Sequence, residues 1–230
     1  MPADADARQL TPRLVELVGL AGAGKTSLSC TLAKQNSQIF LPADLQLRKP
    51  EHLQIFLLQM PSLLPLLAHH CRSSCPYTWV EMKAIAYLEG WDGYLKKQAI
   101  HGARILLLDH GPLFKLATLH AFQKEKFAIP AFERWWNNTL QRWSNALDLV
   151  IWLDAPQRDL LQRINDRAQR HPVKGMPAAE AIEFFARYRV SYQHIRSMLV
   201  ACGQPPVVDA DTSQVPLEQL TDQLLSYLVG

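Results

Sequence analysis

Cysteine is scarce in this sequence, and the few cysteines follow no recognisable pattern. They show neither the spacing of a disulfide framework nor that of a zinc site. His69 and His70 lie beside one of them, but no matching pair of ligands occurs elsewhere, so we expect no metal centre there. Free thiols without an export signal predict a cytoplasmic protein. The four residues are Cys30, Cys71, Cys75 and Cys202.

The sequence also lacks a large excess of either charge and lacks long apolar runs. The 24 Lys and Arg residues nearly balance the 21 Asp and Glu residues and form no basic block, so nucleic acid is not expected as a partner. The first six residues are acidic and do not read as a signal peptide. The longest apolar stretch, 53–68, contains two glutamines and two prolines and is too short to cross a bilayer, so we expect no membrane association.

One glycine-rich stretch follows an apolar run at 14–18. It reads Gly-Leu-Ala-Gly-Ala-Gly-Lys-Thr over residues 19–26, which is the pattern G-x-x-x-x-G-K-[ST]. Between a strand and a helix, such a loop turns its backbone N–H groups towards nucleotide phosphates. Lys25 would reach the β- and γ-phosphates, and the Thr26 hydroxyl would ligate Mg²⁺. The expected nucleotide contacts are Gly19, Ala21, Gly22, Ala23, Gly24, Lys25, Thr26 and Ser27.

Strand-like and helical segments alternate along the 230 residues, which predicts a single doubly wound α/β domain. The expected strands are 14–18, 38–41, 104–109, 149–154 and 206–209. The runs 104–109 and 149–154 are continuously apolar up to a final Asp, as in parallel strands buried on both faces. A helix at 25–35 and three apolar stripes predict the main helices. The stripes are Phe132, Trp136, Leu140, Trp143 and Leu147; Ile182, Phe185, Tyr188, Tyr192, Ile195 and Leu199; and Leu217, Leu220, Leu224 and Leu228.

The segment 42–100 carries no strand signal and predicts a helical lobe at the carboxyl edge of the sheet, where ligands bind in such folds. It includes four aromatic residues that suit either the core or the walls of a pocket for a flat ring. These are Trp79, Tyr87, Trp91 and Tyr94. The tryptophans of the 132–147 stripe are expected in the core.

Three aspartates follow expected strands. Asp109 either holds Mg²⁺ beside the glycine-rich loop or caps the helix that Pro112 opens. Asp154 is expected to form a capping box with Gln157. Asp44 is either a general base for an acceptor hydroxyl or a turn residue.

Four cations follow the fourth strand at spacings of four, three and four residues. If one helix ran through them they would share a face, but His171, Pro172 and Gly175 predict a loop there. Arginines on a movable segment suit phosphoryl transfer, because planar guanidinium groups match phosphate oxygens bidentately. We therefore expect a lid at 163–178, although a solvated basic surface would read similarly. The four are Arg163, Arg167, Arg170 and Lys174.

Together these motifs resemble the P-loop nucleoside and nucleotide kinases, most closely the thymidylate-kinase-like branch. The matching pieces are residues 19–26, 107–111, 150–154 with the arginines that follow, and 207–211. The resemblance implies a three-layer fold with a five-stranded parallel sheet in the order 2-3-1-4-5, a helical lid, and ATP with Mg²⁺. It also implies that residues 210–212, including Asp211, lie near the adenine.

Two departures fall on the acceptor side. His110 stands where this group usually has an arginine that binds the acceptor phosphate, and 41–44 reads Leu-Pro-Ala-Asp instead of an Arg-Glu-Pro type sequence. The resemblance therefore does not support thymidylate as the substrate.

The sequence predicts an ATP-dependent phosphotransferase that moves the γ-phosphoryl group to a small, nucleoside- or nucleotide-like acceptor. Its expected catalytic residues are Lys25, Asp44, Asp109, Arg163 and Arg167, with Thr26 and Asp109 on the metal. The alternatives are a P-loop ATPase or switch that acts on a protein partner, and a non-catalytic nucleotide-binding module. Whether the chain is a monomer or a homodimer stays open, because a stripe that packs inside looks like one that packs on a twin chain.

Overall fold

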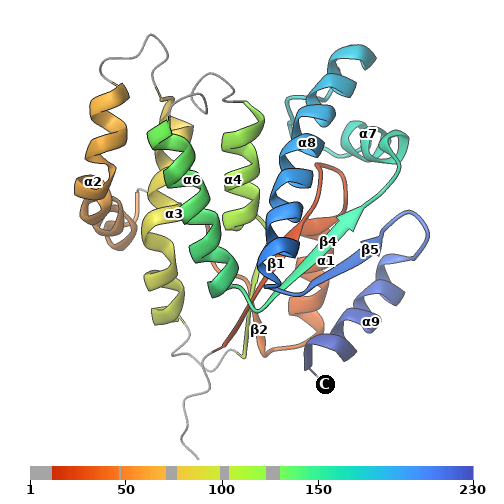
Figure 1. The fold of residues 1–230 in the computed structure, drawn as a ribbon. Helices are drawn as coiled ribbons and strands as arrows, with labels where there is room; N and C mark the ends of the chain where they lie inside the picture. Colours follow the sequence, from red (N-terminus) through yellow and green to blue (C-terminus); the bar gives the residue numbers. More distant parts are fainter. Residues whose placement is uncertain (1–11, 47, 71–76, 99–103, 123–129, 230) are drawn as a thin grey trace, which may run out of the picture.

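A five-stranded parallel sheet forms the centre of the computed structural model, which describes residues 12–46, 48–70, 77–98, 104–122 and 130–229 (Figure 1). The strand order is β2-β3-β1-β4-β5, which confirms the predicted 2-3-1-4-5 order. β2 is shorter than expected, whereas β5 continues two residues further. The strands are β1 Arg13–Val18, β2 Ile39–Phe40, β3 Ile105–Leu108, β4 Leu149–Asp154 and β5 Val207–Asp211.

The inner strands are apolar and buried, as continuous hydrophobic runs require in a parallel sheet covered on both faces. All four residues of β3 are buried, and so are the last five of β1. β1 pairs with β3 through Glu16 and Leu108, and with β4 through Val15 and Leu149. These registers bring the carboxyl ends of β1, β3 and β4 to one edge of the sheet.

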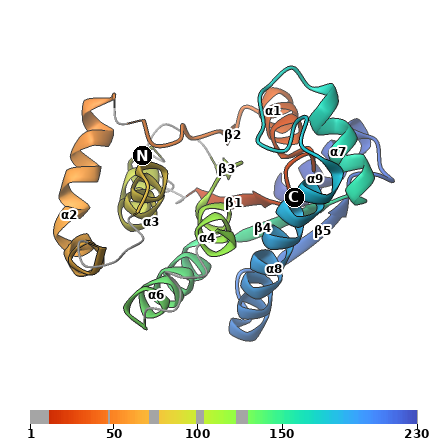
Figure 2. The ribbon, with the colours of Figure 1, turned by 90° about the horizontal axis from the view of Figure 1, so that it is seen from above.

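Helices cover both faces and complete a three-layer fold. α1 (Lys25–Gln35) and α9 (Leu217–Val229) pack together on one face. α4 (Pro112–Ala121) and α8 (Ala178–Cys202) pack together on the other, with α6 (Pro130–Ala146) beside α4 (Figure 2). This confirms the predicted fold class.

The segment expected to form a helical lobe contains α2 (Pro50–His70) and α3 (Trp79–Gln98), which pack against each other. α3 also contacts α4 and α6, so the helix pair continues the helical layer on that side of the sheet (Figure 2). Tyr87 and Trp91 of α3 are 2 % and 0 % exposed. They belong to the hydrophobic core.

The tryptophan stripe of α6 lies in the core, as predicted. Trp136 and Trp143 are fully buried, and their indole N–H groups donate to the carbonyl oxygens of Leu116 (3.2 Å) and Leu88 (2.9 Å). The stripe on α8 is likewise buried at Phe185, Tyr192, Ile195 and Leu199, while Tyr188 is half-buried and Ile182, near the start of the helix, is 51 % exposed.

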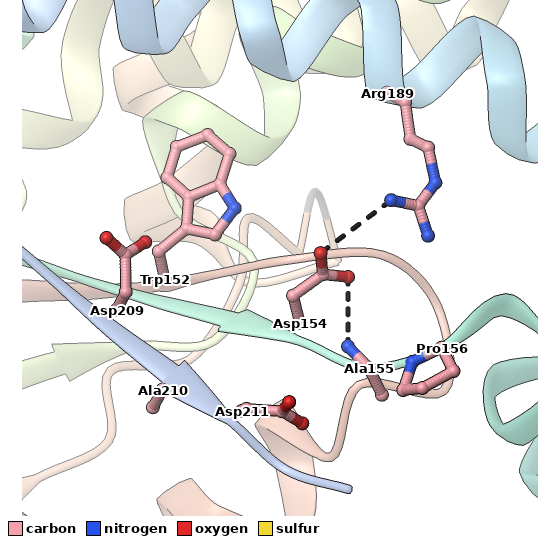
Figure 3. Close-up of a pocket in the computed structure, with 8 residues that line it drawn as sticks. All are labelled: Trp152, Asp154, Ala155, Pro156, Arg189, Asp209, Ala210 and Asp211. Atoms are coloured by element: carbon pink, nitrogen blue, oxygen red, sulfur yellow. Dashed lines mark hydrogen bonds and ion pairs between the residues drawn. The ribbon is translucent and has the colours of Figure 1, made fainter.

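The turn between β4 and α7 (Gln157–Asp166) differs from the expectation. Asp154 accepts the N–H of the next residue, Ala155, at 2.9 Å, and Arg189 approaches its other oxygen at 3.7 Å (Figure 3). Pro156 is the N-cap residue of α7, with φ −53°, and no described side chain makes a cap hydrogen bond there. The predicted capping box is therefore wrong, because the N-cap residue is Pro156, two residues beyond Asp154, and the helix begins at Gln157.

None of the helices within the described ranges combines the length and the apolar character that a membrane crossing needs. The His69–Cys75 cluster, from which no metal centre is expected, lies outside the residues whose side chains are described.

We expect Trp143→Ala to lower the free energy of unfolding by about 3–5 kcal/mol, because it empties a fully buried site and removes the donor to Leu88. Trp79→Ala is the matched control, since Trp79 is 59 % exposed, and should cost less than about 1 kcal/mol. Urea unfolding followed by circular dichroism measures both. Equal losses in the two variants would contradict the core position of Trp143.

Candidate functional site

The glycine-rich loop lies between β1 and α1 and packs tightly on the chain around it. Gly22 has φ +86°, and a Cβ added there would lie 2.6 Å from the carbonyl oxygen of Leu160 on α7. Gly19 also has positive φ, and its missing Cβ makes room for the carbonyl of Leu153 on β4. Only glycine satisfies both the backbone conformation and the contact at these positions.

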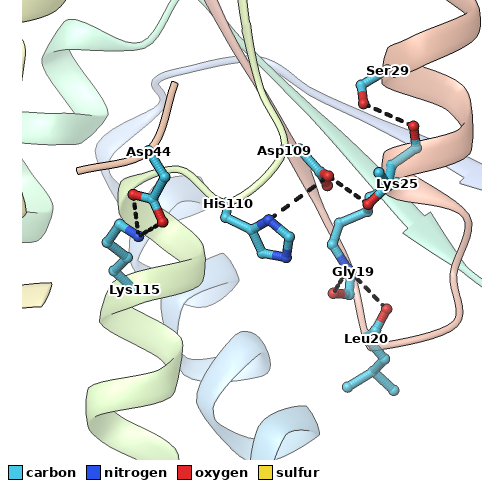
Figure 4. Close-up of polar contacts among 9 residues, drawn as sticks. Gly19, Leu20, Lys25, Ser29, Asp44, Asp109, His110 and Lys115 are labelled. Atoms are coloured by element: carbon cyan, nitrogen blue, oxygen red, sulfur yellow. Dashed lines mark hydrogen bonds and ion pairs between the residues drawn. The ribbon is translucent and has the colours of Figure 1, made fainter. Parts of the chain in front are cut away.

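Lys25, the first residue of α1, is folded back over this loop. It is 7 % exposed, and its Nζ donates to the carbonyl oxygens of Gly19 (2.8 Å) and Leu20 (3.0 Å) (Figure 4). Burial lowers the pKa of the ammonium group to about 8, while the charge of Asp109 acts in the opposite direction. The loop thus encloses a cation at the position where a phosphate would lie.

Thr26 and Asp109, the two predicted metal ligands, are in direct contact. The Thr26 hydroxyl donates to Asp109 Oδ2 at 2.6 Å. The other carboxylate oxygen, Oδ1, is buried and has no hydrogen-bond partner among the described residues. Gly111 is the N-cap residue of α4, and the free N–H groups of the first turn that bind a side chain donate to Glu16, so the alternative that Asp109 caps this helix is wrong.

Glu16, in the middle of β1, binds the start of α4 instead. It is fully buried, and its two carboxylate oxygens accept the N–H groups of Leu113 and Phe114, each at 3.0 Å. Its carboxylate fills the space beside Gly111, where an added Cβ would lie 2.6 Å from Glu16 Cδ. Burial raises the pKa of Glu16 to about 8 despite these two hydrogen bonds. Sequence reasoning missed this residue, although a lone carboxylate in an apolar strand is a signal.

A cavity of about 420 Å³ opens over the loop. Its walls are the loop, the start of α1, the end of α7 and facing side chains of α4 and α8. Most predicted phosphate-binding residues line it, while Ala23 is buried beneath the loop. The predicted residues on its surface are Gly19, Ala21, Gly22, Gly24, Lys25, Thr26, Ser27, Arg163 and Arg167.

The two arginines of this cavity differ in their contacts. Arg163 donates to Thr212 Oγ1 (2.9 Å), to the Thr212 carbonyl (2.8 Å) and to the Gly22 carbonyl (3.3 Å). It therefore links α7, the glycine-rich loop and the segment after β5. The Nε of Arg167 is buried and lacks a partner within the described part of the chain.

The predicted lid begins at the end of α7. The helix stops at Asp166, so the other three cations follow it in a connection that runs to Ala178 and do not share a helical face with Arg163. Lys174 donates to the Arg167 carbonyl. Arg170 and Lys174 are exposed and do not line the cavity.

His110 and Asp44 lie on the other side of Asp109 (Figure 4). The His110 ring packs edge-on against Phe114, with its Nδ1 3.7 Å from Asp109 Oδ2, and burial lowers its pKa. Asp44 pairs with Lys115 at 3.0 Å and accepts the N–H of Leu45. His110 lines the cavity, but Asp44 does not.

Five aromatic side chains line the cavity, and one of them, Tyr192, donates its hydroxyl to the Gly19 carbonyl of the loop at 3.3 Å. They come from α4 and α8, and not from the α3 residues that the sequence offered as pocket walls. They are Phe114, Phe184, Phe185, Tyr188 and Tyr192. Spacings of four residues along α8 place three of them on one side of that helix.

Asp211, expected near a nucleotide base, lies outside this cavity. It lines a second cavity of about 530 Å³ between β4, β5 and α8 (Figure 3). Its carboxylate accepts the N–H (2.8 Å) and the hydroxyl (2.6 Å) of Ser213, which lowers its pKa. The structure therefore keeps Asp211 away from the residues around the loop. Asp44 lies outside the cavity but near it, since its charge acts on the pKa of His110, which lines the cavity.

A divalent metal would have few protein ligands here. In the described part of the chain, no three His, Cys, Asp or Glu side chains cluster closely enough to hold one. Mg²⁺ suits such a place, since it binds through one or two protein oxygens and completes its shell with water and phosphate oxygens. The Thr26 hydroxyl and the unpartnered Asp109 Oδ1 fit that role.

The chain has the fold of P-loop nucleoside kinases. A deoxyadenosine kinase from M. mycoides with bound dATP is 14% identical, with a TM-score of 0.57 over 94% of this chain and 100% of that one. The structures of that enzyme with dCMP and dCDP and with dCTP are 14% and 15% identical, with the same TM-score over 94% of this chain and 98% of theirs. No protein-family model and no curated protein sequence matches the chain.

We expect Glu16→Gln to flatten the pH dependence of stability. Because the native pKa is raised from 4.5 to about 8, the contribution of Glu16 is fully present below pH 4.5 and is lost as the pH rises through 8. The wild-type melting temperature should therefore fall more steeply between pH 5 and 8 than that of the variant. Differential scanning calorimetry measures this, and Glu218→Gln, on the exposed side of α9, should keep the wild-type slope. Parallel curves for all three proteins would contradict the raised pKa.

Proposed function

We propose that this chain is an ATP-dependent phosphotransferase that moves the γ-phosphoryl group to the hydroxyl of a small acceptor. The observation that carries the proposal is the Thr26–Asp109 contact beside the enclosed Lys25, which leaves one buried carboxylate oxygen without a partner. A loop that only turned the chain would not require these three groups together. The fold shared with nucleoside kinases supports the same activity.

On the donor side, the N–H groups of the 19–24 loop and of Ser27 face the triphosphate. Lys25 leaves the carbonyls of Gly19 and Leu20 and binds the β- and γ-phosphates. Arg163 holds the loop and the segment containing Thr212 in place, and Asp211 lies at the base end of the nucleotide.

Thr26 and Asp109 hold Mg²⁺ in this proposal. The ion, when bound, neutralises charge on the phosphate oxygens. Arg167, at the end of α7, lines the same cavity and has an Nε without a partner among the described residues, so it is available to bind these oxygens. Its guanidinium group stabilises the charge that builds up during transfer and helps to exclude water.

The acceptor hydroxyl oxygen forms the new bond to the γ-phosphorus. The bond from phosphorus to the bridging oxygen breaks, and ADP leaves with that electron pair. Asp44 receives the hydroxyl proton, and Lys115, 3.0 Å away, holds the carboxylate in place.

The cavity favours an acceptor with a flat ring, because Phe114, Phe184 and Tyr188 line it. A nucleoside or nucleotide has such a ring and a hydroxyl for transfer. The similar structures contain deoxynucleotides, which supports this class.

We expect Lys25→Ala to weaken ATP binding by about tenfold to a hundredfold, because a hydrogen bond to a charged group contributes about 1.5–3 kcal/mol. Isothermal titration calorimetry measures the affinity. Mass spectrometry of products, over a panel of nucleosides and nucleotides, identifies the acceptor. Lys34→Ala is the matched control, because Lys34 is an exposed lysine in the last turn of α1. It should change neither the ATP affinity nor the products.

Unchanged ATP binding and turnover in Lys25→Ala would overturn the proposal. Hydrolysis that depends on a protein partner and on no small acceptor would favour the switch alternative. ATP binding without any turnover would favour the non-catalytic module.

Substitutions of Arg163 and Arg167 should have different effects on kcat and on ATP affinity. Arg167→Met should lower kcat by about a thousandfold, as loss of a transition-state arginine does, with little change in ATP affinity. Arg163→Met removes contacts to Thr212 and Gly22, so it should weaken ATP binding and lower the melting temperature while leaving most of kcat at saturating ATP. Steady-state kinetics with titration calorimetry checks both. The reverse assignment of effects would contradict these roles.

A further inference from the structure

The segment that carries Asp44 is attached to the helices at two points. Residues 41–46 follow β2 without regular structure before α2 begins at Pro50. Asp44 pairs with Lys115 of α4, and the Gln46 N–H donates to Nδ1 of His52 in α2 at 2.9 Å.

His52 is built into the interior of the helix pair. It is 0 % exposed, and its ring packs edge-on against Trp91 and Tyr94 of α3, with centroid distances of 4.9 Å to each. Its Nε2 lies 3.0 Å from Tyr94 Oη. A buried polar ring fixed by two hydrogen bonds and two aromatic contacts has little freedom to move.

These contacts determine the tautomer of His52. The Gln46 amide can only donate, so Nδ1 must accept with its lone pair. The proton is then on Nε2, which donates to Tyr94 Oη. Burial and the charge of Lys49 lower the pKa of His52, in keeping with a neutral ring. The charges of Glu51 and Asp44 raise it and do not outweigh the burial.

The attachment at Asp44 is equally well supported. Lys115 lies over the buried ring of Tyr87 at 4.4 Å from its centroid and reaches both Asp44 oxygens, at 3.0 and 3.3 Å. α4 itself is held on β1 through Glu16. Asp44 is thus placed by α4, and the segment behind it is placed by α2.

We propose that His52 is a positioning residue for the acceptor side of the site, which it orders by accepting the Gln46 amide and so holding the 41–46 segment with Asp44 beside Lys115. This inference rests on the proposed function, because it assigns Asp44 to the acceptor hydroxyl. His52 does not touch substrate in this role. Its effect reaches Asp44, and through Asp44 the reaction, along the backbone that joins Gln46 to Asp44.

Two polar variants test whether the hydrogen-bond acceptor for the Gln46 amide must lie at the position of His52 Nδ1. In His52→Asn the side-chain oxygen occupies the place of Nδ1 and can accept the Gln46 amide. In His52→Gln the oxygen reaches the place of Nε2, and the amide loses its acceptor. Tyr94→Phe is the control, because it removes the hydroxyl opposite Nε2 and leaves the Gln46 bond in place.

We expect His52→Gln to lower kcat/KM for the acceptor by about tenfold to a hundredfold, since small displacements of catalytic groups have effects of this size. The ATP dissociation constant should stay within about twofold, because the 19–26 loop is not attached to α2. Hydrogen exchange at the Gln46 amide should accelerate in His52→Gln and stay slow in His52→Asn and Tyr94→Phe. His52→Asn should also retain most of the acceptor kcat/KM.

The proposal is overturned if His52→Gln frees the Gln46 amide without changing acceptor kinetics, or if it weakens ATP and acceptor equally. It is also overturned if Asn and Gln variants behave alike. A wild-type protein that phosphorylates no acceptor overturns the proposed function and, with it, the kinetic part of this inference. Hydrogen exchange at the Gln46 amide still decides whether the hydrogen bond from this amide to His52 exists.

Discussion

The buried carboxylate of Glu16 is the contact on which the geometry of the site depends. β1 leads directly into the glycine-rich loop, and three residues before that loop Glu16 accepts two N–H groups from the first turn of α4. α4 follows Asp109 and carries Lys115, so one side chain fixes Asp109 with its Thr26 contact, and Lys115 with its Asp44 contact, relative to the loop. A buried carboxylate without those donors would be strongly unfavourable, which makes the contact between strand and helix obligatory.

Much of the fold could be predicted because its signals are local. The apolar run 149–154 corresponds to β4, and the tryptophan stripe of α6 is buried where its spacing placed it. The strand order came from the resemblance, since pairing between distant strands leaves no local pattern. An error arose where one residue overrides a pattern, because Pro156 moves the start of α7 away from Asp154. The Thr78–Glu81 pair, which forms a capping box at the start of α3, was overlooked although its spacing is readable.

The site was predicted unevenly for a similar reason. Residues 19–26 and Asp109 follow from motif and position, and the structure brings Thr26 and Asp109 together. Glu16, His52 and Lys115 could not be found in this way, because each depends on a partner at least six residues away: Glu16 on Leu113, His52 on Gln46, and Lys115 on Asp44. The acceptor side is made largely of such long-range contacts, so its sequence signals are the weakest. Most aromatic residues of the cavity also come from α8, more than 70 residues beyond the segment whose aromatic residues suited either the core or a pocket.

The close contact between Gly22 and the Leu160 carbonyl limits which part of the predicted lid, 163–178, can move. Together with the Arg163 contacts to Gly22 and Thr212, it makes α7 part of the rigid frame up to its last residue, Asp166. The 167–177 connection therefore starts from a fixed point at the end of α7, and it is held again at Val173, which is 2 % exposed. The predicted lid is thus anchored on both sides of the exposed Arg170, and only the short stretch between these two points is left to move.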